Sequence, residues 1–238
     1  MLSPAMTRRF LTVGVVTAGL AVAWATATPQ PALADDAPAY ADPTSDAMNQ
    51  TAPDVFDAVF TLATGDETSV VVIRTQRDWA PLGADRFYNL VKSGYFNDQR
   101  IFRVVPGFVA QFGIHGDPDI SANWRPAQIK DDPINPDISN TRGRVVFANA
   151  GPHTRTTQLF INFDDNAFLD NPAQMRGSVF APFGEVVEGL DAVDAINAQY
   201  GERPNQGAIQ TQGNAYLDAT FPNLTRIVSA TIIEPDRE

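Results

Sequence analysis

The chain has 238 residues, a formal net charge of −11 and no cysteine. This acidic balance disfavours binding to nucleic-acid phosphates or anionic lipid headgroups, and the missing cysteine excludes disulfides, thiol nucleophiles and thiolate metal sites. The hydrophobic share of 44%, with 10% aromatic residues, is typical of a globular core and not of a disordered chain.

Residues 1–34 have the layout of an export signal. Two adjacent arginines precede an uncharged apolar run over residues 10–28, and an A-L-A cleavage site ends at residue 34. The arginine pair is similar to a twin-arginine signal, although the usual spacer before Phe10 is missing. Because the apolar run approaches the ~20 residues that span a bilayer, an uncleaved anchor is the alternative. We expect a cleaved signal peptide and no stable membrane association afterwards.

Residues 35–53 are rich in proline, alanine and aspartate, which predicts a disordered leader. One folded domain is therefore expected over residues 54–238. It begins with two strand-like runs, at residues 55–62 and 70–74, on either side of a Thr-Gly-Asp turn. This pattern predicts a β-hairpin.

A helix is predicted over residues 82–93. Phe87, Leu90 and Val91 recur there at helical spacing, and Gly94 follows at the position of a C-cap. We expect this helix to cover one end of a sheet.

Residues 101–113, I-F-R-V-V-P-G-F-V-A-Q-F-G, place a charge inside a strand-like apolar run. Because side chains alternate on a strand, Arg103 shares a face with Val105, and Phe102 shares the other face with Val104. An unpaired charge on an apolar face is costly. Two interpretations of these residues stay open: a structural arginine whose head reaches water, or an arginine that faces a ligand.

Residues 114–141 contain several prolines, which exclude a long central strand. His115 and Asp117 lie close enough in sequence to suggest a metal, but the other histidine is His153 and no third ligand accompanies the pair. We expect no metal and no cofactor.

A second motif lies at residues 145–161, V-V-F-A-N-A-G-P-H-T-R-T-T-Q-L-F-I. A strand here runs into small residues that let another chain approach closely. The two motifs together resemble the cyclophilin family of peptidyl-prolyl cis–trans isomerases, with its R-[IV]-[IV]-P-G-F-x-x-Q-x-G, A-N-A-G-P and Q-F-F-I patterns. The resemblance extends over about residues 54–235.

Near the C-terminus, apolar spacing predicts a short helix over residues 190–196 and a last strand over residues 226–233. Residues 201–222 read as a polar insertion rich in Gly, Gln and Asn. Short strands with turn signals, alternating with only two helical patterns, predict an all-β, closed antiparallel β-barrel with two capping α-helices. The resemblance implies that this barrel has eight strands.

The resemblance also implies roles for residues of a groove. Arg103 would be catalytic, donating to the nitrogen of a twisted prolyl amide, and no nucleophile would be needed. The implied substrate-binding residues are Phe108, Val109, Gln111, Ala148, Asn149, Ala150, Gln158, Phe160, Phe168, Leu169 and Phe180.

Two of these residues depart from the family pattern. Phe168 stands where the family has tryptophan, which keeps an apolar wall but removes an indole N–H donor. Phe180 aligns with the family's groove histidine and removes a polar contact to the substrate backbone.

The hypothesis is an isomerase that acts on X–Pro bonds and assists the folding of exported proteins. The alternative is a weakly active or inactive module that binds proline-containing segments in the same groove. We expect proline-containing polypeptides as partners, no nucleic acid, and a monomer. The expected location is the periplasm or the cell exterior, with an organelle lumen as the alternative.

The first prediction is that the mature protein begins at Asp35, because the A-L-A site follows an uncharged apolar run. Mass spectrometry of exported material will measure the N-terminus. Mature protein that still carries Met1 would contradict cleavage.

Overall fold

The computed structural model describes residues 37–233, so the expected export signal lies outside the described residues. The elements of this part, in chain order, are η1 (Ala39–Ala41), η2 (Asp46–Met48), β1 (Val55–Thr64), β2 (Glu67–Gln76), α1 (Pro81–Lys92), β3 (Gln99–Arg100), β4 (Arg103–Val105), β5 (Val109–Phe112), α2 (Pro118–Trp124), β6 (Arg144–Phe147), β7 (Leu159–Asn162), η3 (Ala167–Asp170), β8 (Pro182–Glu188), α3 (Leu190–Asp194), α4 (Gln206–Thr220) and β9 (Arg226–Ile233).

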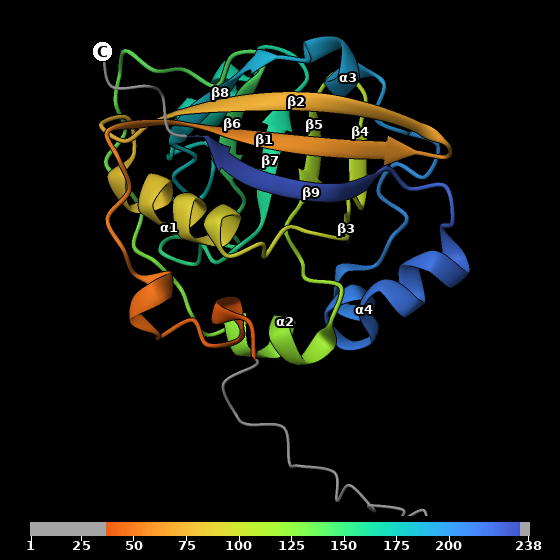
Figure 1. Ribbon diagram of the computed structural model, residues 1–238. Helices are drawn as coiled ribbons and strands as arrows, with labels where there is room; N and C mark the ends of the chain where they lie inside the picture. The colour runs from red at the N-terminus through yellow and green to blue at the C-terminus, as the bar shows by residue number, and fades with distance from the viewer. Residues whose placement is uncertain (1–36, 234–238) are drawn as a thin grey trace, which may run out of the picture. The chain divides into compact units, whose positions relative to one another are not determined.

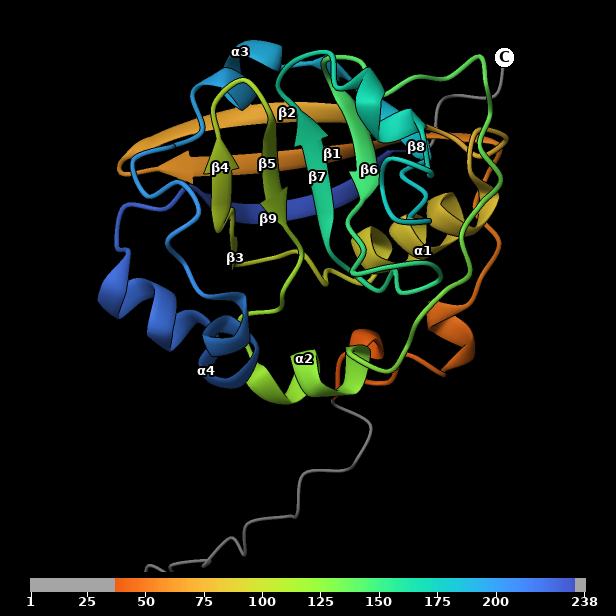
Figure 2. The ribbon, with the colours of Figure 1, turned by 180° about the vertical axis from the view of Figure 1, so that it is seen from behind.

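The strands of residues 37–233 form one nine-stranded sheet in the order β3-β9-β1-β2-β8-β6-β7-β5-β4. Figure 1 shows β2, β1 and β9 crossing in front of β6, β7, β5 and β4, and Figure 2 shows the same two groups from behind. The sheet curls so that the groups face each other across the core, where the rings of Phe60 on β1 and Phe112 on β5 lie 6.0 Å apart. The all-β prediction is confirmed.

The predicted closed eight-stranded barrel is not confirmed, and the reason lies in residues 99–105. This extended segment pairs first with β9 and then with β5: Ile101 N–H donates to Thr225 O at 2.9 Å, and Phe102 N–H donates to Gln111 O at 3.1 Å. The segment therefore forms both ends of the sheet, as β3 and β4. The two ends of the sheet, β3 and β4, are therefore joined by the continuous chain at residues 101–102 and not by hydrogen bonds between two neighbouring strands.

The predicted hairpin is confirmed as β1 and β2, which pair from Val55↔Gln76 to Thr64↔Glu67. Gly65 takes the positive φ of 61° that a two-residue hairpin turn requires. The last strand is confirmed as β9, which pairs with β1 on its other side.

The predicted first helix is confirmed as α1, and a distant carboxylate caps its N-terminus. Asp132 accepts hydrogen bonds from the N–H groups of Leu82 and Gly83, at 2.8 and 2.9 Å. These groups lack partners inside the helix, and the helix dipole favours a negative charge at this end. Asp132 also accepts from Arg155 at 2.9 Å, and both side chains are almost fully buried. Gly94 ends the helix with a φ of 82°.

The core of the curled sheet is built largely from aromatic side chains. Phe87 on α1 stacks on Phe60 with ring centroids 6.1 Å apart, and it meets Phe183 of β8 at 4.9 Å. Each ring is at most 2% exposed, and burying one such side chain contributes about 1.5–3 kcal/mol. The apolar stripe of α1 thereby fixes the helix against the sheet.

The described residues contain four α-helices, where the sequence predicted two. The predicted helix over 190–196 is α3, which ends earlier at Asp194. α2 and α4 arise in segments that were expected to be loop and polar insertion. α4 has only three buried residues and a kink at Gly213, so its sequence lacks a clear apolar stripe. Two of the buried residues, Ile209 and Leu217, pack in a small cluster with Phe102.

Residues 37–53 also differ from the expected disordered leader. They carry η1 and η2, and Met48 is 1% exposed in the main core. Tyr40 O accepts from Trp124 Nε1 at 2.7 Å, and Ala52 N–H donates to Asp85 Oδ1 at 2.8 Å. A few specific contacts thus order a segment whose composition indicated disorder.

The buried pair of Arg155 and Asp132 yields the second prediction. Arg155→Met should lower the free energy of unfolding by about 3–5 kcal/mol, because it leaves a buried carboxylate without its counter-charge. Chemical denaturation will measure this loss.

The matched control is Arg74→Met, which breaks a bidentate pair with Asp57 on the β1–β2 hairpin. The Arg74 side chain is 43% exposed, so this change should cost at most about 1 kcal/mol. Equal losses of unfolding free energy in the two variants would refute the prediction that the buried pair contributes more to stability than the exposed one.

Candidate functional site

All twelve residues of the expected groove line one cavity of about 480 Å³. They come from β4, β5, β7, η3 and the segments around residues 148–158 and 180. The predicted lining residues are Arg103, Phe108, Val109, Gln111, Ala148, Asn149, Ala150, Gln158, Phe160, Phe168, Leu169 and Phe180.

Four further residues line the cavity and were missed in the sequence: Thr154, Thr156, Met175 and Gln206. Thr154 and Thr156 lie within the second motif on either side of Arg155, whose burial only the structure shows. Met175 and Gln206 lie in segments that carried no motif.

Strand register places the polar residues of the groove in one row. Arg103 lies opposite Gln111 in the β4–β5 pair, and Gln111 lies opposite Phe160 in the β5–β7 pair. Directly opposed residues project to the same face. The row therefore carries a cation, an amide and an aromatic ring side by side across the groove.

The Arg103 guanidinium is held by three neighbours. Its Nη1 donates to Gln111 Oε1 at 3.3 Å, and Gln111 Nε2 in turn donates to Gln158 Oε1 at 2.9 Å. Its Cζ lies 5.6 Å from the centre of the Phe108 ring. Its Nε and Nη2 donate to Glu202 Oε1 at 2.8 and 2.5 Å. Glu202 was not predicted, since it lies in the segment that read as a polar insertion.

Both interpretations of Arg103 left open by its own stretch find support. The side chain is 24% exposed and ion-paired, as a structural arginine would be. It also lines the cavity, as a ligand-facing arginine must.

Two ring pairs build the apolar seat beside this arginine. Phe108 stacks on Phe168 at 5.9 Å, and Phe160 meets Phe180 edge-on at 6.0 Å. Phe160 packs in a buried cluster with Leu169. Phe168 is 47% exposed, which places it at the rim and not at the floor.

The wall around residues 150–156 is held from behind by a buried cation. Arg86 on α1 donates to Thr156 O at 3.1 Å and to Ala127 O at 2.8 Å, and its Cζ lies 4.9 Å from the Trp124 ring. Burial, with repulsion from Arg155, lowers the pKa of Arg86 to about 10. The guanidinium remains charged at neutral pH and fixes the backbone of a lining residue.

The wall at residues 148–150 leaves the backbone N–H and C=O of one residue, Asn149, without partners among the described residues. The Asn149 side chain donates to Val179 O at 3.0 Å and accepts from Gly151 N–H at 3.3 Å. Within residues 37–233, the backbone N–H and C=O of Asn149 have no hydrogen-bond partner. Asn149 lines the groove, where a bound peptide backbone can satisfy these groups.

No three His, Asp or Glu side chains in the described part of the chain group as metal ligands would. His115 Nδ1 accepts the backbone N–H of Asp117 at 3.0 Å, and its ring lies against those of Tyr40 and Tyr95. Burial lowers the pKa of His115 and so favours its neutral form.

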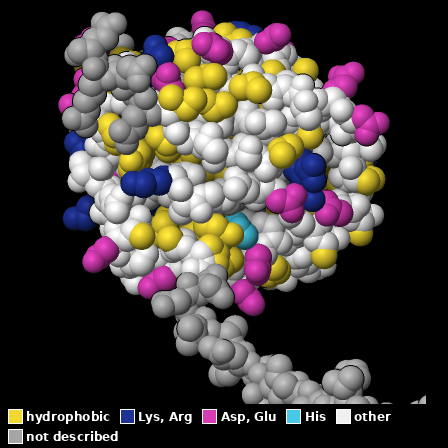
Figure 3. Space-filling view, viewed as in Figure 1, with side chains coloured by type: hydrophobic (Ala, Val, Ile, Leu, Met, Phe, Trp, Pro, Cys, Tyr) yellow, Lys and Arg dark blue, Asp and Glu magenta, His cyan; other side chains and the backbone are white. Residues whose placement is uncertain are grey.

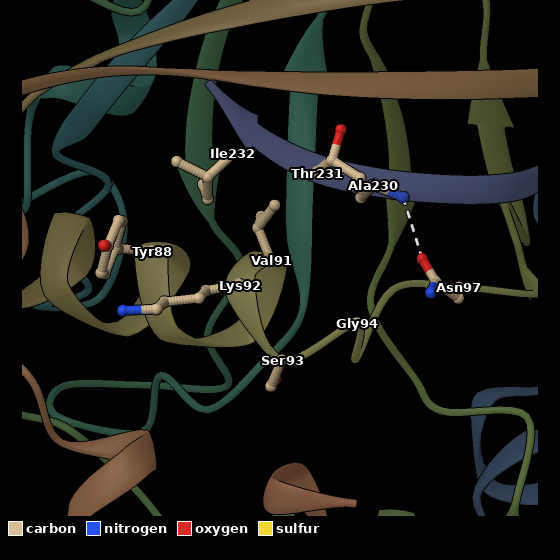
Figure 4. Close-up of a pocket in the computed structure, with 9 residues that line it drawn as sticks. All are labelled: Tyr88, Val91, Lys92, Ser93, Gly94, Asn97, Ala230, Thr231 and Ile232. Atoms are coloured by element: carbon tan, nitrogen blue, oxygen red, sulfur yellow. Dashed lines mark hydrogen bonds between the residues drawn. The ribbon is translucent and has the colours of Figure 1, made fainter. Parts of the chain in front are cut away.

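A second cavity, of about 550 Å³, lies between α1 and β9. Figure 4 shows Val91 of α1 pointing toward Thr231 and Ile232 of β9, with Asn97 Oδ1 accepting from Ala230 N–H at 2.9 Å. Its lining contains none of the expected groove residues. All twelve predicted residues thus line the first cavity, and none of them lines this second one.

Comparison with known proteins agrees with the motifs. The family model described as "Cyclophilin type peptidyl-prolyl cis-trans isomerase/CLD" matches residues 59–214. The chain is 35% identical over 128 residues to "Peptidyl-prolyl cis-trans isomerase B" of Escherichia coli (strain K12), which covers 53% of this chain and 77% of that protein.

Two further relatives give the same result. The chain is 34% identical over 127 residues to "Peptidyl-prolyl cis-trans isomerase" of Acinetobacter baylyi, covering 53% of this chain and 65% of that protein. It is 29% identical over 171 residues to "Probable peptidyl-prolyl cis-trans isomerase" of Brucella abortus (strain 2308), covering 68% and 76%.

The third prediction concerns the amide at the centre of the groove. Gln111→Leu keeps a similar side-chain volume but removes the amide that we expect to bond the peptide backbone. The same amide accepts from Arg103 and donates to Gln158. The affinity for a proline-containing peptide should fall about 2–13-fold, the effect of losing one neutral hydrogen bond. NMR titration will measure it.

Gln212→Leu is the control, because Gln212 is exposed on α4 and lies outside the cavity lining. Peptide affinity that drops equally in both variants, or in neither, would contradict a binding role for Gln111.

Proposed function

The chain belongs to the cyclophilin-type peptidyl-prolyl cis–trans isomerase family, and we propose that it rotates X–Pro bonds in exported polypeptides, with Arg103 as its catalytic group. The observation that carries the proposal is that all twelve residues implied by the family resemblance line one cavity. The leader over residues 1–34 supports export of the protein. Within residues 37–233, no helix has both the length and the apolar composition to cross a membrane.

The chemistry requires a particular kind of site. Rotation of an X–Pro amide must break partial C–N double-bond character, over a barrier of about 20 kcal/mol. No covalent bond to the substrate has to form or break. Acceleration therefore needs a site that binds the twisted amide more tightly than either planar form.

Arg103 supplies the differential interaction. Twisting the amide localises a lone pair on the prolyl nitrogen, and a permanently charged guanidinium can donate to it. The contacts with Gln111, Phe108 and Glu202 fix the orientation of the guanidinium before the substrate arrives. Such preorganisation avoids reorganisation during the reaction.

The apolar seat holds the proline ring. Val109, Phe160 and Leu169 form a buried cluster with Phe108 packed against it, and the rings exclude water from the amide. A drier environment strengthens the hydrogen bond from Arg103, because fewer water dipoles screen it.

The flanking peptide is held separately from the ring. Gln111 and the free peptide groups of Asn149 offer donors and acceptors to the backbone next to the proline. One side of the X–Pro bond is thereby fixed while the other turns, so binding lowers the entropy loss in the rotation step.

The fourth prediction tests Arg103. Arg103→Ala should lower kcat/KM by about 100–1000-fold, the range for removing one preorganised donor. Arg103→Lys should restore only part of the loss, since an ammonium cannot reproduce the guanidinium fork. Isomerisation of an Ala-Pro peptide will measure both rates.

Thermal unfolding provides the control. Because Arg103 pairs with an exposed carboxylate, its removal should change stability by at most about 1 kcal/mol. Full activity in the Ala variant would exclude Arg103 from catalysis. Wild-type protein that binds the peptide without accelerating its isomerisation would support the alternative, a binding module.

A further inference from the structure

Glu202 reaches Arg103 through a backbone connection. β4 is an end strand of the sheet, and its Val104 N–H donates to Gly201 O at 3.1 Å. Gly201 has a positive φ of 56°, and the residue after it is Glu202. This bond brings Arg103, which precedes Val104, next to Glu202, which follows Gly201, so that their side chains are in contact.

The segment that carries Glu202 has an apolar anchor of its own. Tyr200 packs edge-on against Phe221 at 5.2 Å, in the cluster formed by α4 and Phe102. Arg203 donates to Tyr200 O at 3.2 Å and fastens the turn. Figure 2 shows the loop that precedes α4 running beside β4. The insertion therefore holds Glu202 in a defined place.

The donor geometry of Arg103 shows what the contact achieves. A guanidinium carries five N–H groups. Glu202 accepts one from Nε and one from Nη2, and Gln111 accepts one from Nη1. One N–H on each Nη remains for a ligand. Glu202 does not itself line the cavity, whereas Arg103 does.

We propose that Glu202 is a positioning residue for the isomerase reaction: it orients the Arg103 guanidinium so that the remaining N–H groups on Nη1 and Nη2 point at the prolyl amide. This inference rests on the proposed function of Arg103. The insertion around α4 then serves catalysis by delivering one carboxylate to the back of the catalytic cation.

The fifth prediction tests this role with Glu202→Gln. The variant should lower kcat about 2–5-fold with KM little changed, because an exposed pair contributes modestly and acts on the transition state. Asp218→Asn is the matched control: it weakens another exposed ion pair of the same insertion, with Arg100, and should leave kcat unchanged.

A double-mutant cycle separates positioning from other effects. In the Arg103→Ala background, assayed at raised enzyme concentration, Glu202→Gln should produce no further loss, because no guanidinium remains to be oriented. Losses that multiply independently would overturn the proposal. A higher kcat in the single Glu202→Gln variant would also overturn it, since Glu202 would then compete with the substrate for Arg103.

A spectroscopic readout keeps the inference separate from the proposed activity. In the wild-type protein, the Arg103 Nε–Hε NMR signal should be protected from exchange by the bond to Glu202, and Glu202→Gln should remove most of that protection. Unchanged protection would overturn the inference whether or not the protein isomerises proline peptides. A protected signal in an inactive wild-type protein would instead refute the proposed function alone.

Discussion

The fold of residues 37–233 depends on one extended segment, residues 99–105, that hydrogen-bonds to both ends of the same sheet. Because side chains alternate along it, neighbouring residues serve opposite structures. Phe102 is 1% exposed and anchors the apolar cluster of α4, while Arg103 faces the groove. The same backbone thus positions Arg103, the proposed catalytic group, and the insertion that supplies its carboxylate partner. A shift of one residue in this segment would exchange the two faces and destroy both.

The opposite wall of the groove relies on the same alternation. Thr154 and Thr156 line the cavity, and Arg155 between them points inward to its buried pair with Asp132. Asp132 also caps α1, and Arg86 of α1 holds Thr156 O. The helix and the wall are therefore tied by charged groups that water cannot reach. Such contacts are costly to break, so they hold the backbone of the lining threonines in place. The Thr154 hydroxyl adds its own bonds, accepting from Ala150 N–H and donating to Gly151 O.

The sequence was sufficient for those parts whose determinants are contiguous. The hairpin, α1 and β9 follow from local periodicity, and the twelve lining residues follow from the resemblance to the cyclophilin family. Glu202 lies 99 positions from Arg103 and belongs to no motif, so only the three-dimensional structure pairs them. α4 was missed because its apolar residues are few and Gly213 interrupts it with a φ of 59° and a ψ of −145°. The way in which the two ends of the sheet are joined was not predicted for a related reason. Ile101 bonds to Thr225 and Phe102 bonds to Gln111, and this change of partner depends on residues far apart in the sequence.

The placement of charge explains how an acidic protein can present a cation to a neutral amide. The chain carries a net charge of −11, yet the one charged side chain among the cavity-lining residues is Arg103. Its counter-charge, Glu202, lies outside that lining and is 63% exposed. The pair is therefore a fixed dipole with its positive end toward the groove. In the proposed mechanism, this dipole stabilises the lone pair that appears only when the amide twists, while long-range attraction or repulsion of planar substrates stays weak. This is the difference in binding between twisted and planar states that rotation requires.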